Sequence, residues 1–259
     1  MHGLSVIVIT YNEAANIEAC LRSVSFADEV IVLDSGSTDT TCVQAAALGA
    51  QVHHTTDWPG FGAQKNRALA LATQSWVLAI DADERVTPVL AQQITSALAA
   101  DKHPAYELSR LTQFCGRWIR HCGWTPDRVL RLFKRCSAEF SCDLVHERVV
   151  LKKGDAGRLS EPLLHFSYPT PSHYWRKLES YSQAWAKQRH SQGQKTTMLR
   201  AAVSGVVAFI RSYVFRLGFL DGAMGFAVCA MQAQAAFGKY FALYCLQQIN
   251  DDSNPSSNP

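Results

Sequence analysis

Runs of apolar residues in the first third of the chain predict a buried parallel sheet. The runs at Leu4 to Thr10, Val30 to Leu33 and Trp76 to Ile80 are typical of strands that are covered on both faces. A shorter strand is expected at Gln51 to Thr55. Between these runs the apolar positions recur at helical spacing, so the four strands should alternate with three helices. This alternation predicts an α/β fold with a doubly wound, mostly parallel sheet.

The pattern after residue 100 is less regular and predicts further strands. Tyr106 to Phe114 and Val129 to Phe133 are predicted as strands, and the loop between them carries Trp124. Leu144 to Leu151 is also strand-like, but the polar residues His146 and Glu147 interrupt it. A carboxylate in such a strand should be partly desolvated, which raises its pKa.

Three helical segments are predicted near the C-terminal end. Tyr174 to His190 should form a basic helix. Met198 to Arg216 combines a long apolar run with Arg200 and Arg211 on one helix face, which is the pattern of a helix lying in a membrane interface. Gly222 to Gly238 is free of charge, but it is shorter than the roughly 20 residues of a spanning helix.

The distribution of charge supports a division of the chain. Residues 1–100 carry ten acidic against four basic side chains, whereas residues 173–216 carry eight basic side chains and one acidic. We therefore expect a catalytic domain over residues 1–170, a helical membrane-associated extension over 171–250 and a disordered tail over 251–259. A helical cap packed on the sheet is the alternative for the extension.

Composition bears on the compartment and on the partners. Eight cysteines show no C-x-x-C spacing, which disfavours a zinc site. The chain runs from Met1 directly into a predicted strand, so no signal peptide is expected. We expect a cytoplasmic protein that is peripheral on the inner face of the cytoplasmic membrane, attached to its anionic surface. Nucleic acid is disfavoured as a partner, because Met198 to Leu220 has too much apolar surface for a phosphate groove.

The candidate chemistry gathers at the ends of the predicted strands. Tyr11 and Glu13 follow the first strand, Asp34 ends the second, and Asp81 and Asp83 follow the fourth. The carboxyl edge of such a sheet is where ligands bind, and an acid pair there suits a hard divalent cation that bridges a diphosphate. Taken singly, each acid could instead cap or solvate a turn.

Phosphate binding would have to rely on that cation and on a basic side chain. The chain has neither G-x-G-x-x-G nor G-x-x-x-x-G-K-[ST], which disfavours dinucleotide binding and P-loop hydrolysis. Lys65, near the start of the helix before the fourth strand, is the candidate for a phosphate contact. A solvated lysine is the alternative.

Several stretches resemble a known family. TYNEAANIEACLRSV, VIVLDSGSTDTT, GFGAQKNRAL and VLAIDADE resemble the successive motifs of glycosyltransferase family 2, which has the GT-A fold, and they cover residues 4–90. RVLRLFKR, LVHERV, LLHFSY and FLDGAMGF resemble one branch, the lipopolysaccharide core β-glucosyltransferases that add glucose to heptose.

The resemblance implies a nucleotide-diphospho-sugar donor, UDP-glucose in that branch, and assigns roles at the strand ends. Thr10, Tyr11, Glu13 and Asp34 would hold the uridine, and Asp81 would lie near the ribose and phosphates. Asp83 would ligate Mg²⁺ or Mn²⁺.

The resemblance also implies roles for residues that come later in the chain. His165 would complete the metal's coordination, although an ordinary hydrogen-bonded histidine is the alternative. Glu147 would be the general base of an inverting transfer, with Asp143 as the second choice. Glu147 could instead pair with Arg148 or Lys152 on an exposed strand.

Trp124 is a further candidate contact to the donor. A tryptophan in the loop of a sugar enzyme can stack on a pyranose ring, or it can belong to the core. The sequence does not decide between these two places for Trp124.

These inferences predict an inverting, metal-dependent glycosyltransferase with a lipid-linked or lipopolysaccharide core acceptor. Two alternatives stay open. One is transfer to a polyprenyl phosphate, which basic interfacial helices would also suit. The other is a non-catalytic nucleotide-sugar-binding membrane adaptor, which would need Asp83 but not Glu147.

Overall fold

The computed structural model describes residues 2–141 and 148–252, and their contacts divide the chain into two compact units. The first unit comprises Met1–Leu111 and Pro126–Phe166, and the second comprises Thr112–Thr125 and Ser167–Pro259. The sequence analysis placed residues 112–125 in the catalytic domain. In the structure their buried side chains pack with aromatic and apolar residues of the C-terminal helices.

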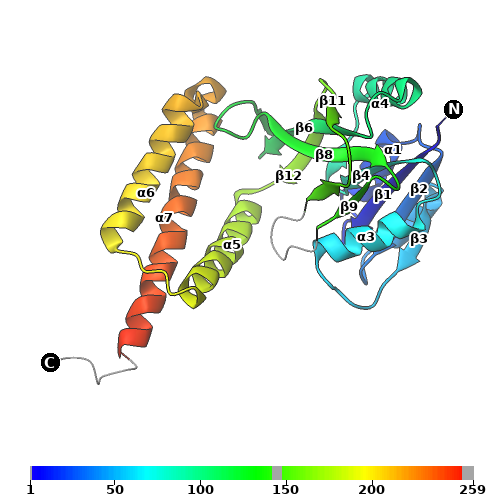
Figure 1. Ribbon diagram of the computed structural model, residues 1–259. Coiled ribbons are helices and arrows are strands. Elements are labelled where there is room, and N and C mark those ends of the chain that lie inside the picture. Colours follow the sequence, from blue (N-terminus) through cyan, green and yellow to red (C-terminus); the bar gives the residue numbers. More distant parts are fainter. Residues whose placement is uncertain (1, 142–147, 253–259) are drawn as a thin grey trace. The chain divides into compact units, whose positions relative to one another are not determined.

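The first unit begins with four parallel strands, as the apolar runs predict. They lie in the order β3-β2-β1-β4 (Figure 1), with bounds β1 Leu4–Thr10, β2 Glu29–Asp34, β3 Gln51–His54 and β4 Trp76–Asp81. The helices that follow or precede them are α1 Ile17–Ser23, α2 Thr41–Ala47, α3 Phe61–Leu71 and α4 Pro88–Ala100. The predicted doubly wound α/β sheet is confirmed.

Alternation of side chains along the parallel strands fills two separate cores. Val6 and Val8 of β1 pack with apolar residues of α1, α2 and α4 on one face of the sheet. Ile7 packs with Ala68 and Ala72, in and after α3, on the other face. Both faces are therefore covered, and ligands can reach these strands only at their ends.

A mostly antiparallel half extends the sheet beyond β4, with β11 as its parallel strand. The order continues β4-β8-β6-β12-β5, and β11 pairs with β6. The bounds are β5 Glu84–Arg85, β6 Ala105–Phe114, β8 Asp127–Lys134, β11 Ala156–Arg158 and β12 Leu163–Tyr168. A separate two-stranded sheet pairs β9, Ala138–Phe140, with β10, Val149–Leu151. The pairing of β8 with β4 and of β12 with β5 brings residues from distant parts of the chain beside the end of β4.

The second unit is mainly helical. Its elements are β7 Arg117–Ile119, α5 Pro171–Ser191, α6 Met198–Ile210, the π-helical turn η1 Arg211–Phe215, the 3-10 turn η2 Gly218–Asp221 and α7 Gly222–Asp252. Helices α6 and α7 run side by side (Figure 1). They approach closely at Gly205, where an added Cβ would lie 3.2 Å from the carbonyl oxygen of Ala233.

Candidate active site

Asp34 lies at the carboxyl end of β2 in a pocket of hydrogen-bond donors. One carboxylate oxygen accepts from the Thr10 hydroxyl at 3.0 Å and from the Ser37 hydroxyl. The other accepts from the backbone N–H groups of Gly36 at 2.9 Å and Ser37 at 2.8 Å. Burial alone would raise the pKa of Asp34, but these donors outweigh it and hold the pKa below its ordinary value. Asp34 is therefore a fixed anion at neutral pH.

The loop after β1 is tied to the loop after β2 by Asn12, which adopts a left-handed backbone conformation with φ of 55°. Its side-chain oxygen accepts from the Thr38 N–H at 2.8 Å, and its own N–H donates to the Ser37 hydroxyl. The neighbouring Tyr11 is 60% exposed. Glu13 donates its N–H to the Thr41 hydroxyl at 2.8 Å. The structure thus brings together four of the predicted nucleotide contacts, Thr10, Tyr11, Glu13 and Asp34, on two adjoining strand ends.

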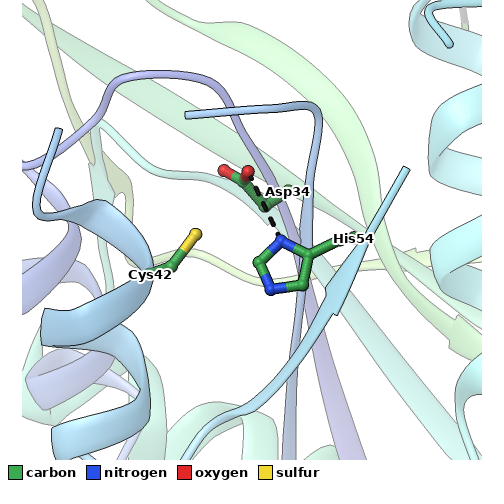
Figure 2. A group of neighbouring side chains, drawn as sticks. All are labelled: Asp34, Cys42 and His54. Carbon is green, nitrogen blue, oxygen red and sulfur yellow. Dashed lines mark ion pairs between the residues drawn. The ribbon is translucent and has the colours of Figure 1, made fainter. Parts of the chain in front are cut away.

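Cys42 and His54 stand beside Asp34 (Figure 2), and the three candidate ligand atoms lie within 4.8 Å of one another. The His54 Nδ1 lies 3.8 Å from the carboxylate. Burial raises the pKa of the Cys42 thiol, and the charge of Asp34 adds to the effect, so the sulfur keeps its proton. A protonated thiol is a poor metal ligand, and a cysteine with an imidazole would in any case suit zinc and not Mg²⁺ or Mn²⁺. This group is therefore a poor site for the cation of a diphosphate.

Asp81, at the end of β4, is held between two cations. Its carboxylate lies 3.0 Å from the Lys65 ammonium and 2.6 Å from the Arg131 guanidinium. Burial would raise the pKa of Asp81, but Arg131 and then Lys65 overcome it and hold the pKa well below the ordinary value. Lys65 is almost fully buried. The predicted phosphate contacts Asp81 and Lys65 therefore form one ion-paired group with Arg131.

Glu84 completes this group, although the sequence analysis did not predict a role for it or for Arg131. Glu84 is fully buried, accepts the backbone N–H of Asp81 at 2.8 Å and accepts from Arg131 at 2.9 Å. Arg110 also approaches Glu84 at 3.7 Å. The available signal was the arginine inside the apolar strand RVLRLFKR, because a buried arginine needs an acidic partner. The register of β8, which carries Arg131, against β4 could not be predicted from the sequence.

Asp83 and His165 are brought together by the antiparallel pairing of β5 with β12. In this pairing His165 lies opposite Glu84, and the Phe166 N–H donates to the backbone oxygen of Asp83 at 2.8 Å. The His165 Nε2 lies 3.3 Å from an Asp83 carboxylate oxygen, and both side chains keep some exposure, 14% and 23%. The two residues predicted as metal ligands thus offer one nitrogen and two oxygens on one side of the β4 end.

Trp124 belongs to the second unit, where it packs among aromatic rings. Its ring centroid lies 5.5 Å from that of Tyr168 and 6.5 Å from that of Tyr174. These contacts place Trp124 against the buried cluster of the second unit. They match the alternative in which this residue belongs to a core.

Glu147 and Asp143, the candidate bases, lie outside the described residues. The chain on either side of them is described: Ser141 donates its N–H to the Arg148 oxygen at 2.8 Å. Lys152, considered above as a partner of Glu147, lies 3.4 Å from Glu139.

This chain is similar to known glycosyltransferases over most of its length. Residues 5–138 match the model of the family described as Glycosyl transferase family 2. A glycosyltransferase of Rickettsia bellii is 31% identical over 273 residues, which span 98% of this chain and 89% of that protein.

Two further similarities extend over nearly the full length. The lipopolysaccharide core biosynthesis glycosyltransferase LpsC of Rhizobium meliloti is 30% identical over 96% of both chains. The crystal structure of residues 1–349 of TarS from S. aureus superposes with a TM-score of 0.50 and 14% identity, over 96% of this chain and 92% of that one. The latter is a likeness of fold alone.

Proposed function

Since this chain belongs to glycosyltransferase family 2 and is an inverting glycosyltransferase, we propose that it moves glucose from UDP-glucose to a heptose of the lipopolysaccharide inner core. The relationship to LpsC over almost the whole chain supports the class of acceptor. The observation that carries the proposal is the convergence of acidic groups on the ends of the adjacent strands β2, β1 and β4.

The nucleotide would bind on the Asp34 side of this edge. Asp34 is ionised and already accepts four hydrogen bonds, so an N–H of the base would take the place of a hydroxyl donor, that of Thr10 or Ser37, which can rotate away. The exposed Tyr11 offers a ring face for stacking. Glu13 lies in the same loop and is suited to a hydroxyl of the ribose.

A divalent cation would bind on the Asp83 side. A carboxylate and an imidazole fit Mn²⁺ in particular, and Mg²⁺ through the oxygens and water. Asp81 fits this role less well, because Lys65 and Arg131 already neutralise it. When bound, the cation would offset the charge of the departing diphosphate. The antiparallel pairing of β5 with β12 would hold Asp83, which directly precedes β5, in place.

The acceptor hydroxyl would lose its proton to Glu147. An inverting transfer needs one base on the face opposite the leaving group, and Glu147 is the choice that follows from the resemblance of LVHERV. The paired ends of β9 and β10 anchor the chain on both sides of residues 142–147. Asn66 of α3 secures β9, because its side chain exchanges two hydrogen bonds with the backbone of Phe140.

A donor and acceptor screen tests the proposal. The purified protein would be given UDP-glucose, UDP-galactose, UDP-N-acetylglucosamine or GDP-mannose. The acceptor would be a heptose-terminated inner-core oligosaccharide or polyprenyl phosphate, and each pair would be tested with Mn²⁺, with Mg²⁺ or with chelator. We expect a β-linked glucosyl product from UDP-glucose that is lost with chelator. Transfer only to polyprenyl phosphate would refute the acceptor, and an unchanged rate with chelator would refute the metal.

A further inference from the structure

The outer face of α6 is apolar and exposed along its whole length. Five large apolar residues lie on this face, namely Leu199, Val203, Val206, Val207 and Ile210. Their spacing of three and four residues places them within one stripe of the helix. We call these residues the α6 face.

The opposite side of α6 packs against α7. Ala201 and Gly205 are buried, and the Ser204 hydroxyl donates to the Ala236 oxygen of α7 at 3.0 Å. A helix that merely capped a soluble protein would have polar residues on its other side. Here both sides are apolar, and only one of them has a partner in the described part of the chain.

The turn beyond α6 continues the exposed apolar surface. Phe215 is 76% exposed, and Leu217, Phe219 and Leu220 are also exposed. We call these four residues the tip. The helical stretch Met198–Phe215 is long and apolar enough to cross a membrane, with a mean hydropathy of 1.4, yet only 17% of it is buried. A core helix of that composition would be mostly buried, so its exposure needs another explanation.

Basic side chains border both surfaces. Arg200 and Arg211 are exposed and lie eleven residues apart, three turns along the edge of the α6 face. Near the tip, the side chain of Arg216 lies over Gly123, within 3.6 Å of where a Cβ would stand. Arg117 and Arg120, in the adjoining segment of the second unit, are exposed as well.

Asp221 holds this basic segment beside the tip. Its carboxylate accepts the backbone N–H groups of Arg120 at 3.1 Å and of His121 at 2.8 Å, and it contacts His121 Nδ1 at 2.9 Å. The Cys122 N–H donates to the Arg216 oxygen at 3.0 Å. The motif FLDGAMGF, which the proposed reaction does not use, therefore positions the arginines next to exposed phenylalanine and leucine.

The geometry points to a partner that is apolar at its centre and anionic at its margin. The second unit carries eleven Lys and Arg against four Asp and Glu. We propose that the α6 face and the tip insert into one leaflet of a membrane, while Arg117, Arg120, Arg200, Arg211 and Arg216 contact anionic lipid headgroups. This inference does not depend on which sugar is transferred.

Vesicle binding by the full-length protein tests this inference. Flotation would compare phosphatidylcholine vesicles with vesicles that also contain phosphatidylglycerol. We expect binding to the anionic vesicles that weakens as salt is raised. The variant Leu199→Gln/Val206→Gln/Phe215→Gln should bind at least about tenfold more weakly, because it lacks three apolar side chains that would enter the leaflet. Arg200→Gln and Arg211→Gln should each cost about fivefold.

A control is Val89→Gln, which replaces an apolar residue on α4 of the first unit that is 51% exposed, close to the 59% of Val206, and it should bind as the wild type does. Equal binding to neutral and anionic vesicles would overturn the inference, as would unchanged binding of the triple variant. If the wild type forms a dimer and does not bind vesicles, and the triple variant is a monomer, then a second copy of the chain covers the α6 face. Resistance to alkaline extraction from membranes would show a spanning helix instead.

Discussion

The two units place charge and apolar surface in opposite ways. At the end of β4 in the first unit, acidic and basic groups are buried together: Glu84 is fully buried, and Arg131 and Lys65 are nearly so. In the second unit the basic groups lie outside, together with large apolar side chains such as Leu199 and Phe215.

The difference shows what each arrangement can do. Buried charges that neutralise one another fix the positions of neighbouring groups, which serves a reaction whose atoms must be held in place. Exposed apolar and basic groups fix little within the molecule, but they can bind a surface that is itself apolar and anionic. The comparison fits the two proposals made above, in which the first unit carries the transfer reaction and the second unit binds a membrane.

The largest expected effect is on turnover when the proposed base is removed from the first unit. General base catalysis contributes about 10²- to 10⁴-fold, so Glu147→Gln should lower kcat by that factor while the affinity for UDP-glucose stays the same. Calorimetry and a single-turnover assay would measure the two quantities. Glu139→Gln is the control, because this exposed residue is paired with Lys152 and should keep its rate. If Glu147→Gln keeps a near wild-type rate, Glu147 is not the general base and Asp143 becomes the candidate.

Removing the central cation of the buried group should mainly affect stability. Arg131→Met leaves Asp81 and Glu84 without their shared partner, and breaking a buried pair costs about 3 to 5 kcal/mol. Urea denaturation would measure the free energy of unfolding. Arg158→Met removes an exposed ion pair with Glu107 and should cost less than about 1 kcal/mol. Equal losses of unfolding free energy for Arg131→Met and Arg158→Met would show that the buried ion pairs of Arg131 stabilise the protein no more than an exposed pair does.

Asp83→Ala should abolish the dependence of donor binding on metal. Loss of a group that merely orients a metal ligand costs roughly 10- to 100-fold in affinity, and loss of a ligand should cost at least as much. Titration of UDP-glucose with and without chelator would give the same weak affinity for this variant. A chelator effect that persists in Asp83→Ala would exclude Asp83 as a ligand.

The smallest effect is expected where the second unit is changed. Exposed side chains away from special features alter stability by no more than about 0.5 kcal/mol each. Leu199→Gln/Val206→Gln/Phe215→Gln should therefore keep both the unfolding free energy and the rate with a water-soluble acceptor. Thermal unfolding and the transfer assay would check this. A large loss of either would mean that the α6 face contributes to folding or to the reaction itself.

The sequence was sufficient to predict what depends on local pattern. The apolar runs gave β1, β2 and β4 to within a residue or two, and the acidic residues that follow them do lie along one sheet edge. The uncharged stretch Gly222 to Gly238 forms the first part of α7, which runs on to Asp252 and so includes the first two residues of the tail predicted as disordered.

The contacts that could not be predicted depend on register between distant strands. Arg131 reaches Asp81 because β8 pairs antiparallel with β4, and His165 reaches Asp83 because β12 pairs with β5. Nothing local to these residues specifies those pairings, since each is decided by burial on both sheet faces. Glu84 was passed over because its role follows only from the position of Arg131.

The path of the chain between the units determines the order in which they can be completed on the ribosome. The chain leaves the first unit within β6, returns at Pro126, and leaves again within β12. Phe114, Ile119 and Cys122 are therefore synthesised long before α7 supplies Val228 and Cys229, with which they are buried. A nascent chain that stopped after β12 would display this apolar segment uncovered, and it would depend on a chaperone or aggregate.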